Sequence, residues 1–238
     1  VEAGGINNVA IGSESGTAIT TGDNNTALGR KSLRSTTTGH SNVSLGNTTL
    51  CKNVTGTRNV GIGLSALFNT LEDSNTAIGA SAMAANTTGE YNVAVGDNSL
   101  TTNISADRNT AVGFESLKVN TTGTSNVAVG SEALDANTTA SYNTAIGKSS
   151  LTDNTTGAAN TAVGFSALKT NTEGANNVAM GCGALCLSTT GAGNNAIGRN
   201  AMCANTTGSN NTAVGLQALL ANTEGDNNVA IGKQALDA

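Results

Sequence analysis

Side chains that could carry out acid–base, nucleophilic or metal chemistry are few in this sequence, and they are scattered. His40 is the only histidine in 238 residues. The acidic residues stand mostly at variable positions, such as Glu14, Asp97, Glu115 and Glu132. One histidine and dispersed carboxylates do not make a catalytic triad or a metal-ligand cluster, and no pair of carboxylates is singled out for glycoside cleavage. We therefore predict that the chain is not an enzyme and uses no cofactor and no metal ion.

The four cysteines are more informative because of their spacing. Cys203 follows Cys186 at the same interval at which Asn109 follows Asn92. Cys182 shortly precedes Cys186, and Cys51 is distant from all three. That interval is also the period of almost the whole sequence. The cysteines must therefore be placed within the architecture that this period implies.

A frame of the form Asn-Thr/Val-Ala-Val/Ile-Gly recurs fourteen times, for example at 92–96 and 228–232. The interval between frames is constant, except that the step from Asn59 to Asn75 is one residue shorter than the others. A fixed period of this length indicates stacked structural repeats. We number the positions of the repeat from its Asn, which is position 1. The residues at position 1 are Asn8, Asn25, Asn42, Asn59, Asn75, Asn92, Asn109, Asn126, Asn143, Asn160, Asn177, Asn194, Asn211 and Asn228.

Positions 2 to 4 of the repeat are typical of a short strand, because they are rich in β-branched residues and end at a glycine. Position 4 is apolar in every unit, and position 3 is Ala, Ser44 or Gly61. Side chains alternate along a strand, so positions 2 and 4 form a bulky face and positions 3 and 5 a bare face. We expect the bulky face inside each coil, and the bare face against another layer of the same coil or of another subunit.

Positions 8 and 9 supply a second apolar pair, such as Ala66 and Leu67, which fits either a short strand or one helical turn. An Asn-Thr-Thr-Gly turn follows, as at 86–89. One unit cannot bury an apolar face alone, but stacked units can. We predict an all-β fold, a parallel β-solenoid or β-roll of about fourteen 17-residue coils. It forms a single repeat domain over residues 1–238, with full units starting at Asn8 and partial units at both ends.

Stacked strands lie about 4.8 Å apart, so equivalent residues of successive coils lie above one another. The position-1 asparagines then form a structural ladder, because each amide offers a donor and an acceptor to the next. Cys186 and Cys203 both occupy position 10 and would lie about 5 Å apart, within the range of a disulfide. The alternative is two packed thiols. Cys51, also at position 10, is either free or bonded to another chain.

The composition excludes several classes of protein. Aromatic residues make up 2% of the chain and there are 30 glycines, so the small apolar residues can fill only a thin, regular core. Charged residues make up 11% with a net charge of −5, which argues against binding to nucleic acid or to an anionic membrane surface. Apolar residues at a constant phase argue against disorder. No apolar run reaches the length of about 20 residues that a membrane span needs.

The recurring frame resembles the head repeats of trimeric autotransporter adhesins, and it is similar to repeats in some bacteriophage tail fibres. The resemblance extends from Asn8 to Leu236. It implies a left-handed parallel β-roll, three chains packed around an axis, and a surface that binds host matrix or cells. The tiny residues at positions 3 and 5 match what a close contact between three chains needs. The coil here is longer than is usual in that family, with the extra residues in the Asn-Thr-Thr-Gly turn.

We therefore expect a non-enzymatic extracellular fibrous repeat protein, an adhesin head or tail-fibre segment at a cell or virion surface. It would present a rigid surface for host or cell attachment, with a host-cell or matrix receptor as partner, and would form a homo-oligomer. One alternative is a structural filament whose subunits stack head to tail, because open sheet edges invite pairing with another chain. A minor alternative is ice binding, because Thr recurs at positions 13 and 14.

Sequons for N-linked sugar follow from the repeat itself and say little about modification. They occur at Asn86, Asn120, Asn137, Asn154 and Asn205.

Overall fold

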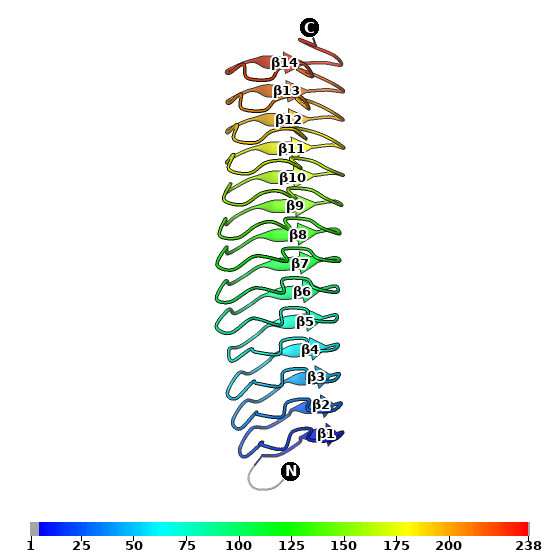
Figure 1. Cartoon of the computed structure of the whole chain (residues 1–238), viewed down its shortest axis with the longest axis vertical. Helices are drawn as coiled ribbons and strands as arrows, with labels where there is room; N and C mark the ends of the chain where they lie inside the picture. The colour runs from blue at the N-terminus through cyan, green and yellow to red at the C-terminus, as the bar shows by residue number, and fades with distance from the viewer. Residues whose placement is uncertain (1–4, 238) are drawn as a thin grey trace. The chain divides into compact units, whose positions relative to one another are not determined.

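The structure is a computed structural model that describes residues 5–237 (Figure 1). It divides into two compact units, Val1–Thr122 and Gly123–Ala238, and each is described by itself. Both units are stacks of the same coil, and each coil contributes one strand of three residues. The prediction that residues 1–238 form one repeat domain stays a prediction.

The strands follow one another along each unit in sequence order. The first unit contains β1 (Val9–Ile11), β2 (Thr26–Leu28), β3 (Val43–Leu45), β4 (Val60–Ile62), β5 (Thr76–Ile78), β6 (Val93–Val95) and β7 (Thr110–Val112). The second unit contains β8 (Val127–Val129), β9 (Thr144–Ile146), β10 (Thr161–Val163), β11 (Val178–Met180), β12 (Asn195–Ile197), β13 (Thr212–Val214) and β14 (Val229–Ile231).

Neighbouring strands within a unit pair in parallel, and every position lies beside the same position of the next coil. Ala94 pairs with Ala111 in the first unit, and Ala162 pairs with Ala179 in the second. The prediction of an all-β fold, a parallel β-solenoid whose coils have the length of the sequence repeat, is confirmed.

The predicted orientation of the strand is wrong, because position 3 lies inside the coil and positions 2 and 4 lie outside. Ala94 has no exposed surface, whereas its neighbour Val93 is 36% exposed. Space explains the difference. A Cβ added to Gly61, which occupies position 3, would lie 2.6 Å from Cγ2 of Thr49 and 3.4 Å from Cδ1 of Leu50. The coil interior has room for Ala opposite Leu, so the larger strand residues face outward.

From the coil that begins at Asn25 to the coil that begins at Asn194, the core is a single long side chain at position 9. The fully buried members of this column are Leu33, Leu50, Leu67, Met83, Leu100, Leu117, Leu134, Leu151, Leu168, Leu185 and Met202.

The segment that carries position 9 is neither a strand nor a helical turn. Leu117 has a φ of 50°, and Glu115 at position 7 has a φ of 55°, so both lie in the left-handed region that large side chains rarely adopt. Backbone hydrogen bonds between coils hold this segment, as where the N–H of Leu100 donates to the carbonyl of Ser116 at 2.9 Å. The sequence left open whether positions 8 and 9 form a strand or a helical turn. The structure shows neither, because this segment is a turn with residues in the left-handed region.

The position-1 asparagine closes each coil and joins it to the next. Asn92 is fully buried, and its Nδ2 donates to the carbonyl of Ala106, in its own coil, at 2.8 Å. Its Oδ1 accepts the backbone N–H of Asn109, in the next coil, at 2.9 Å. In the second unit, Asn160 makes the equivalent bonds to Gly174 and Asn177. The asparagines therefore bond the backbone as much as one another.

A second ladder of amides runs through position 12 and is interrupted once in the second unit. Nδ2 of Asn154 donates to Oδ1 of Asn137 at 3.1 Å, and Nδ2 of Asn171 donates to Oδ1 of Asn154 at 2.8 Å. The next residue in the column is Ser188. Within residues 5–237, neither Oδ1 of Asn171 nor Oγ of Ser188 has a hydrogen-bond partner. The serine side chain is shorter than the amide that it replaces, and the ladder stops there.

We expect Asn92→Ala to lower the free energy of unfolding by about 3 kcal/mol, because it strands the buried N–H of Asn109 and removes one of the two amide donors to the carbonyl of Ala106. Urea unfolding monitored by circular dichroism measures the change. The matched control is Asn47→Ala, which removes an exposed asparagine of the same unit and should change the stability by less than about 0.5 kcal/mol. Equal effects of the two substitutions would contradict the role given to the ladder.

We expect Ser188→Asn to raise the free energy of unfolding by about 1 kcal/mol, since the introduced amide can donate to Asn171 and accept from Asn205. Thr70→Asn, at another break in the position-12 column, should gain less, because the Thr70 hydroxyl already accepts a bond of 2.8 Å from Asn86. Urea unfolding of both variants tests this order, and a destabilised Ser188→Asn variant would refute it.

Candidate functional site

The outer face of the sheet, formed in each unit by positions 2 and 4, exposes apolar side chains. Ile78 in the first unit is 38% exposed, and Met180 in the second unit is 43% exposed. These side chains belong to interior coils, so their exposure does not come from fraying at a terminus. Parallel pairing places them in two continuous rows along each unit. We call these rows the outer face.

The outer face carries no charge. Position 4 is Val, Ile, Leu or Met in all fourteen coils, and position 2 is Val or Thr in all but one, where it is Asn195. Exposed apolar side chains that lie side by side on a soluble protein are a candidate interaction surface. The composition of positions 2 and 4 can be read from the sequence, but only the structure shows that these positions face outward.

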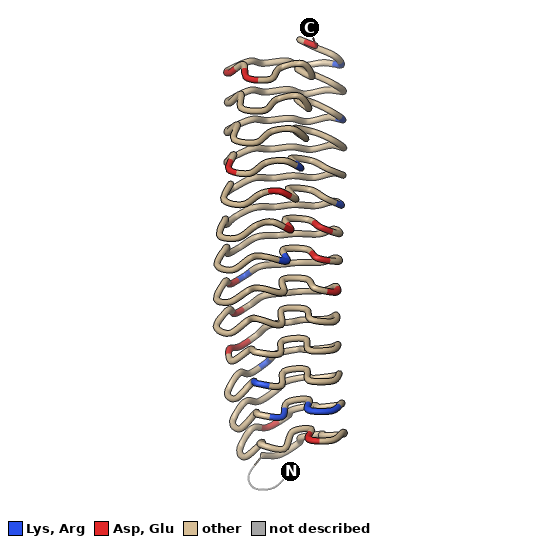
Figure 2. The backbone as a smooth tube through the Cα atoms, viewed as in Figure 1, with Lys and Arg blue, Asp and Glu red and all other residues tan. Residues whose placement is uncertain are grey.

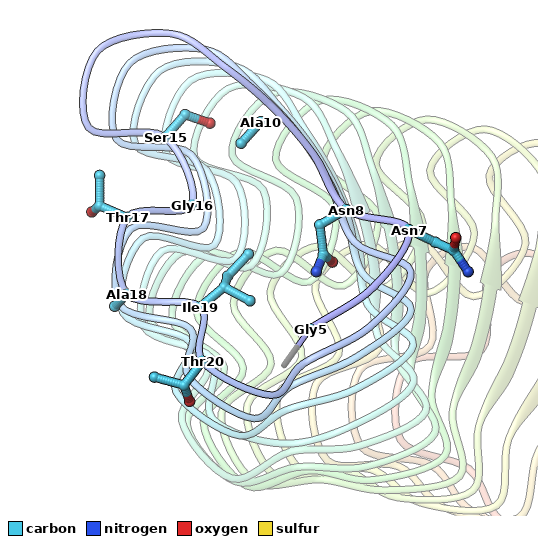
Figure 3. A pocket seen from close by; sticks show the side chains of 10 residues that line it. All are labelled: Gly5, Asn7, Asn8, Ala10, Ser15, Gly16, Thr17, Ala18, Ile19 and Thr20. Carbon is cyan, nitrogen blue, oxygen red and sulfur yellow. The ribbon is translucent and has the colours of Figure 1, made fainter. Parts of the chain in front are cut away.

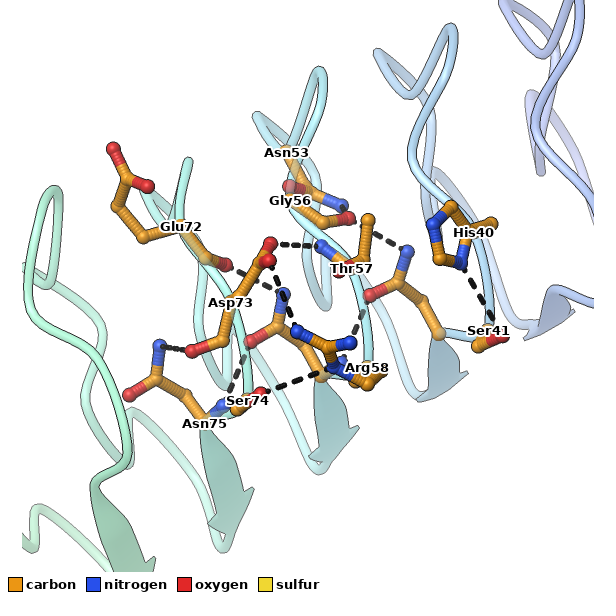
Figure 4. Close-up of polar contacts among 12 residues, drawn as sticks. His40, Ser41, Asn53, Gly56, Thr57, Arg58, Glu72, Asp73, Ser74 and Asn75 are labelled. Atoms are coloured by element: carbon orange, nitrogen blue, oxygen red, sulfur yellow. Dashed lines mark hydrogen bonds and ion pairs between the residues drawn. The ribbon is translucent and has the colours of Figure 1, made fainter.

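A polar corner lies where the coil that begins at Asn59 is one residue short (Figure 4). Arg58 forms an ion pair with Asp73 at 3.4 Å, and Oδ1 of Asp73 accepts the backbone N–H of Thr57 at 2.7 Å. Nδ2 of Asn59 donates to the carbonyl of Glu72 at 2.7 Å, in place of the usual turn residue. The missing residue is absorbed within the turn, and strand register is already restored at Thr76.

This corner also contains His40, whose carbonyl accepts the N–H of Arg58 at 3.1 Å and whose ring lies 3.4 Å from Oγ of Ser41. The ion pair is exposed and contributes little to stability. In the part of the chain that the structure describes, no three His, Cys, Asp or Glu side chains are grouped so that they could hold a metal ion. The backbone contacts of the corner recur in full-length coils, as where Oδ1 of Asp107 accepts the N–H of Glu90 at 2.9 Å, so they belong to the stacking of the coils.

A hollow of about 880 Å³ lies in the interior of the first described coil (Figure 3). Its floor contains Gly16, which stands at position 9 where the other coils have Leu or Met. Asn8 and Ser15 contribute polar groups to its wall. The hollow lies where this coil lacks the core leucine or methionine of the other coils, and its neutral amide and hydroxyl groups provide no nucleophile–base pair.

Cys186 and Cys203 form a disulfide between the coils of β11 and β12, with their Cα atoms 5.0 Å apart. Cys51 is buried and Cys182 is exposed, and both are free thiols. The two bonded cysteines have the same position in adjacent coils, which is the geometry that stacking predicts.

The sequon asparagines and the threonine rows have structural roles. Asn86, Asn120, Asn137, Asn154 and Asn205 are all fully buried, so the folded chain offers none of them to a glycosyltransferase.

At position 13, threonine hydroxyls donate hydrogen bonds to the backbone of the next coil. Oγ1 of Thr155 donates to the carbonyl of Thr172 at 3.0 Å, and Oγ1 of Thr172 donates to that of Thr189 at 3.2 Å. Position 14 is exposed but includes Glu173. The ice-binding hypothesis stays an untested prediction.

Within the described residues, we find no helix that is long and apolar enough to cross a membrane.

No family model matches the chain, and no curated protein matches it. The resemblance to adhesin heads and tail fibres therefore depends on the repeat residues alone.

We expect loss of the disulfide, by Cys203→Ser or by reductant, to lower the free energy of unfolding by about 3 kcal/mol, the value typical of a closed loop of this length. Urea unfolding with and without reductant measures it. Cys182→Ser is the matched control, because that thiol is exposed and free, and it should behave as the wild type. A wild-type midpoint that does not respond to reductant would contradict the prediction.

Proposed function

We propose that this chain is a non-enzymatic extracellular repeat protein that presents a rigid surface for attachment to a host or neighbouring cell. Copies of the chain associate through the outer face. The observation that carries the proposal is this uncharged face of Val, Ile and Thr, which the fold leaves without cover. The resemblance to adhesin heads implies that three copies assemble around an axis.

The energetics support association along a whole unit rather than at one coil. Each unit has seven strands, and each strand has two outer side chains. Covering what remains exposed of one such side chain contributes about 1 kcal/mol, so one unit contributes on the order of 10 kcal/mol. Association costs roughly 4–15 kcal/mol in lost freedom. A stable assembly therefore needs the face to be used over most of its length.

The disulfide supports an extracellular location. Disulfides persist in oxidising compartments and are rare in the reducing cytosol. Cys186 and Cys203 are joined in the folded chain. The low charge, with a net of −5, also favours a cell- or virion-surface role over binding to nucleic acid.

We expect Ile146→Lys combined with Val163→Lys to convert the assembly to a monomer, because the two adjacent charges would be buried without partners in the interface. Size-exclusion chromatography with light scattering measures the mass. Thr156→Lys combined with Thr139→Lys is the matched control, since both threonines are exposed at position 14, away from the outer face, and the mass should not change.

The same measurement separates the proposed function from the filament. A small oligomer of fixed mass supports an attachment surface, whereas rods that lengthen with protein concentration favour a structural filament. A wild-type protein that is monomeric at every concentration would refute association through the outer face.

A further inference from the structure

The second unit concentrates its positive charge at one corner of the coil. Lys148, Arg199 and Lys233 all occupy position 6, directly after the glycine that follows a strand. The only other cation of this unit is Lys169, at position 10. None of the acidic residues of the unit is at position 6. Figure 2 shows Lys or Arg segments at one edge of the stack, at the levels of β9, β12 and β14.

The backbone explains why these side chains project outward. Gly147, which precedes Lys148, has a φ of 128°, and Gly198, which precedes Arg199, has a φ of 137°. This conformation, which favours glycine, turns the chain out of the sheet before position 6. Lys148, Arg199 and Lys233 are all exposed.

The three cations have no carboxylate beside them in their own coils. Position 7 is Ser149, Asn200 and Gln234 in these coils, and position 4 is Ile in each of them. Glu132, in the coil before Lys148, accepts a hydrogen bond of 3.2 Å from Ser149. Among residues 5–237, none forms an ion pair with Lys148, Arg199 or Lys233. Their charge is available to a ligand.

Apolar side chains fill the places between the cations. Phe165 is 55% exposed, Leu216 is 38% exposed, and Cys182 contributes an exposed thiol. We call the six residues at position 6 of successive coils the corner column, and they are Lys148, Phe165, Cys182, Arg199, Leu216 and Lys233.

The spacing along the column favours an extended ligand. Equivalent Cα atoms of adjacent coils lie 5.0 Å apart at Cys186 and Cys203. Lys148 and Arg199 are three coils apart, roughly 15 Å, and Arg199 and Lys233 are two coils apart, roughly 10 Å, from the spacing of stacked strands. A small anion cannot bridge these distances, whereas a linear polymer with repeated negative charges can contact all three.

We propose that the corner column of the second unit binds a linear anionic polysaccharide that lies along the stack. Its carboxylate or sulfate groups pair with Lys148, Arg199 and Lys233. The exposed ring of Phe165 packs against the C–H face of a sugar, to which the negative face of an aromatic ring is suited. The proposal rests on the attachment role and assigns it a class of ligand.

Polysaccharide fits the column better than other polyanions. A nucleic-acid site needs many phosphate contacts and a broad basic surface, whereas the second unit has four cations, three of them in one narrow line, in a chain of net charge −5. Stable binding to an anionic membrane needs either denser charge or a deeply inserted apolar segment. The column provides a few well-separated charges with apolar surface between them.

Retention on immobilised dextran sulfate tests the proposal, with uncharged dextran as the matched matrix. We expect the wild type to be retained at low salt and eluted by sodium chloride, although its pI of about 4.8 opposes retention at pH 7. Each cation changed to Ser should weaken binding about fivefold. The triple variant Lys148→Ser, Arg199→Ser and Lys233→Ser should pass through the column. Lys169→Ser, which removes the one cation of the second unit outside the corner column, should be retained as the wild type is.

Cys182 reports whether binding occurs at the corner column. Cys51 is buried and Cys186 and Cys203 are bonded to each other, so an uncharged maleimide labels Cys182 alone in the folded protein. Soluble dextran sulfate should slow this labelling at least threefold in the wild type and in Lys169→Ser, but not in the triple variant. Uncharged dextran should have no effect.

Three results would overturn the proposal: no retention of the wild type at low salt, equal retention of the triple variant, or labelling of Cys182 that dextran sulfate does not slow. Displacement by phosphatidylserine vesicles or duplex DNA at lower charge concentration than by dextran sulfate would overturn it in favour of a membrane or a nucleic acid. Light scattering in the same buffer measures whether the protein forms its oligomer, so a loss of dextran sulfate binding can be told apart from a loss of self-association. A protein that forms its oligomer but ignores dextran sulfate refutes only the ligand.

Discussion

The narrow interior of the coil is the constraint on which the rest of the structure depends. Each coil has room for one long side chain at position 9, and the strand opposite must present Ala, Ser44 or Gly61 to it. A core one side chain thick cannot be stable in isolation, so each coil depends on its neighbours above and below. Stacking in exact register then follows, because a shifted coil would place a branched residue where only Ala fits.

The same constraint determines what the surface carries. Bulky β-branched residues that the interior cannot hold lie outside, where they form the uncharged outer face. The charged residues of the corner column lie at a corner of the coil, where their side chains are exposed. The two proposals use these two kinds of surface: the outer face for copies of the chain and the corner column for a charged polymer. Neither proposal requires a pocket.

The sequence predicted the period, the strands and the parallel stacking, because side-chain identity recurs at a fixed interval and only stacking uses that regularity. It also placed Cys186 beside Cys203. It failed on which face of the strand is buried, since alternation along a strand defines two faces but does not say which one the coil encloses. The left-handed conformation of Leu117 and its equivalents could not be predicted either, because no local preference of leucine favours it. Only the packing of the whole coil stabilises that geometry.

The disulfide lies beside the interruption of the position-12 ladder at Ser188. Cys186 belongs to the same coil as Ser188, and the bond to Cys203 spans the step to the next coil, where the amide of Asn205 has no asparagine to meet. A covalent link thus joins one of the two steps at which the position-12 ladder is interrupted at Ser188. In an oxidising medium this bond holds the coils of β11 and β12 together, whereas in a reducing one hydrogen bonds and packing alone hold them. The redox state of the surroundings therefore sets how firmly these two coils are joined.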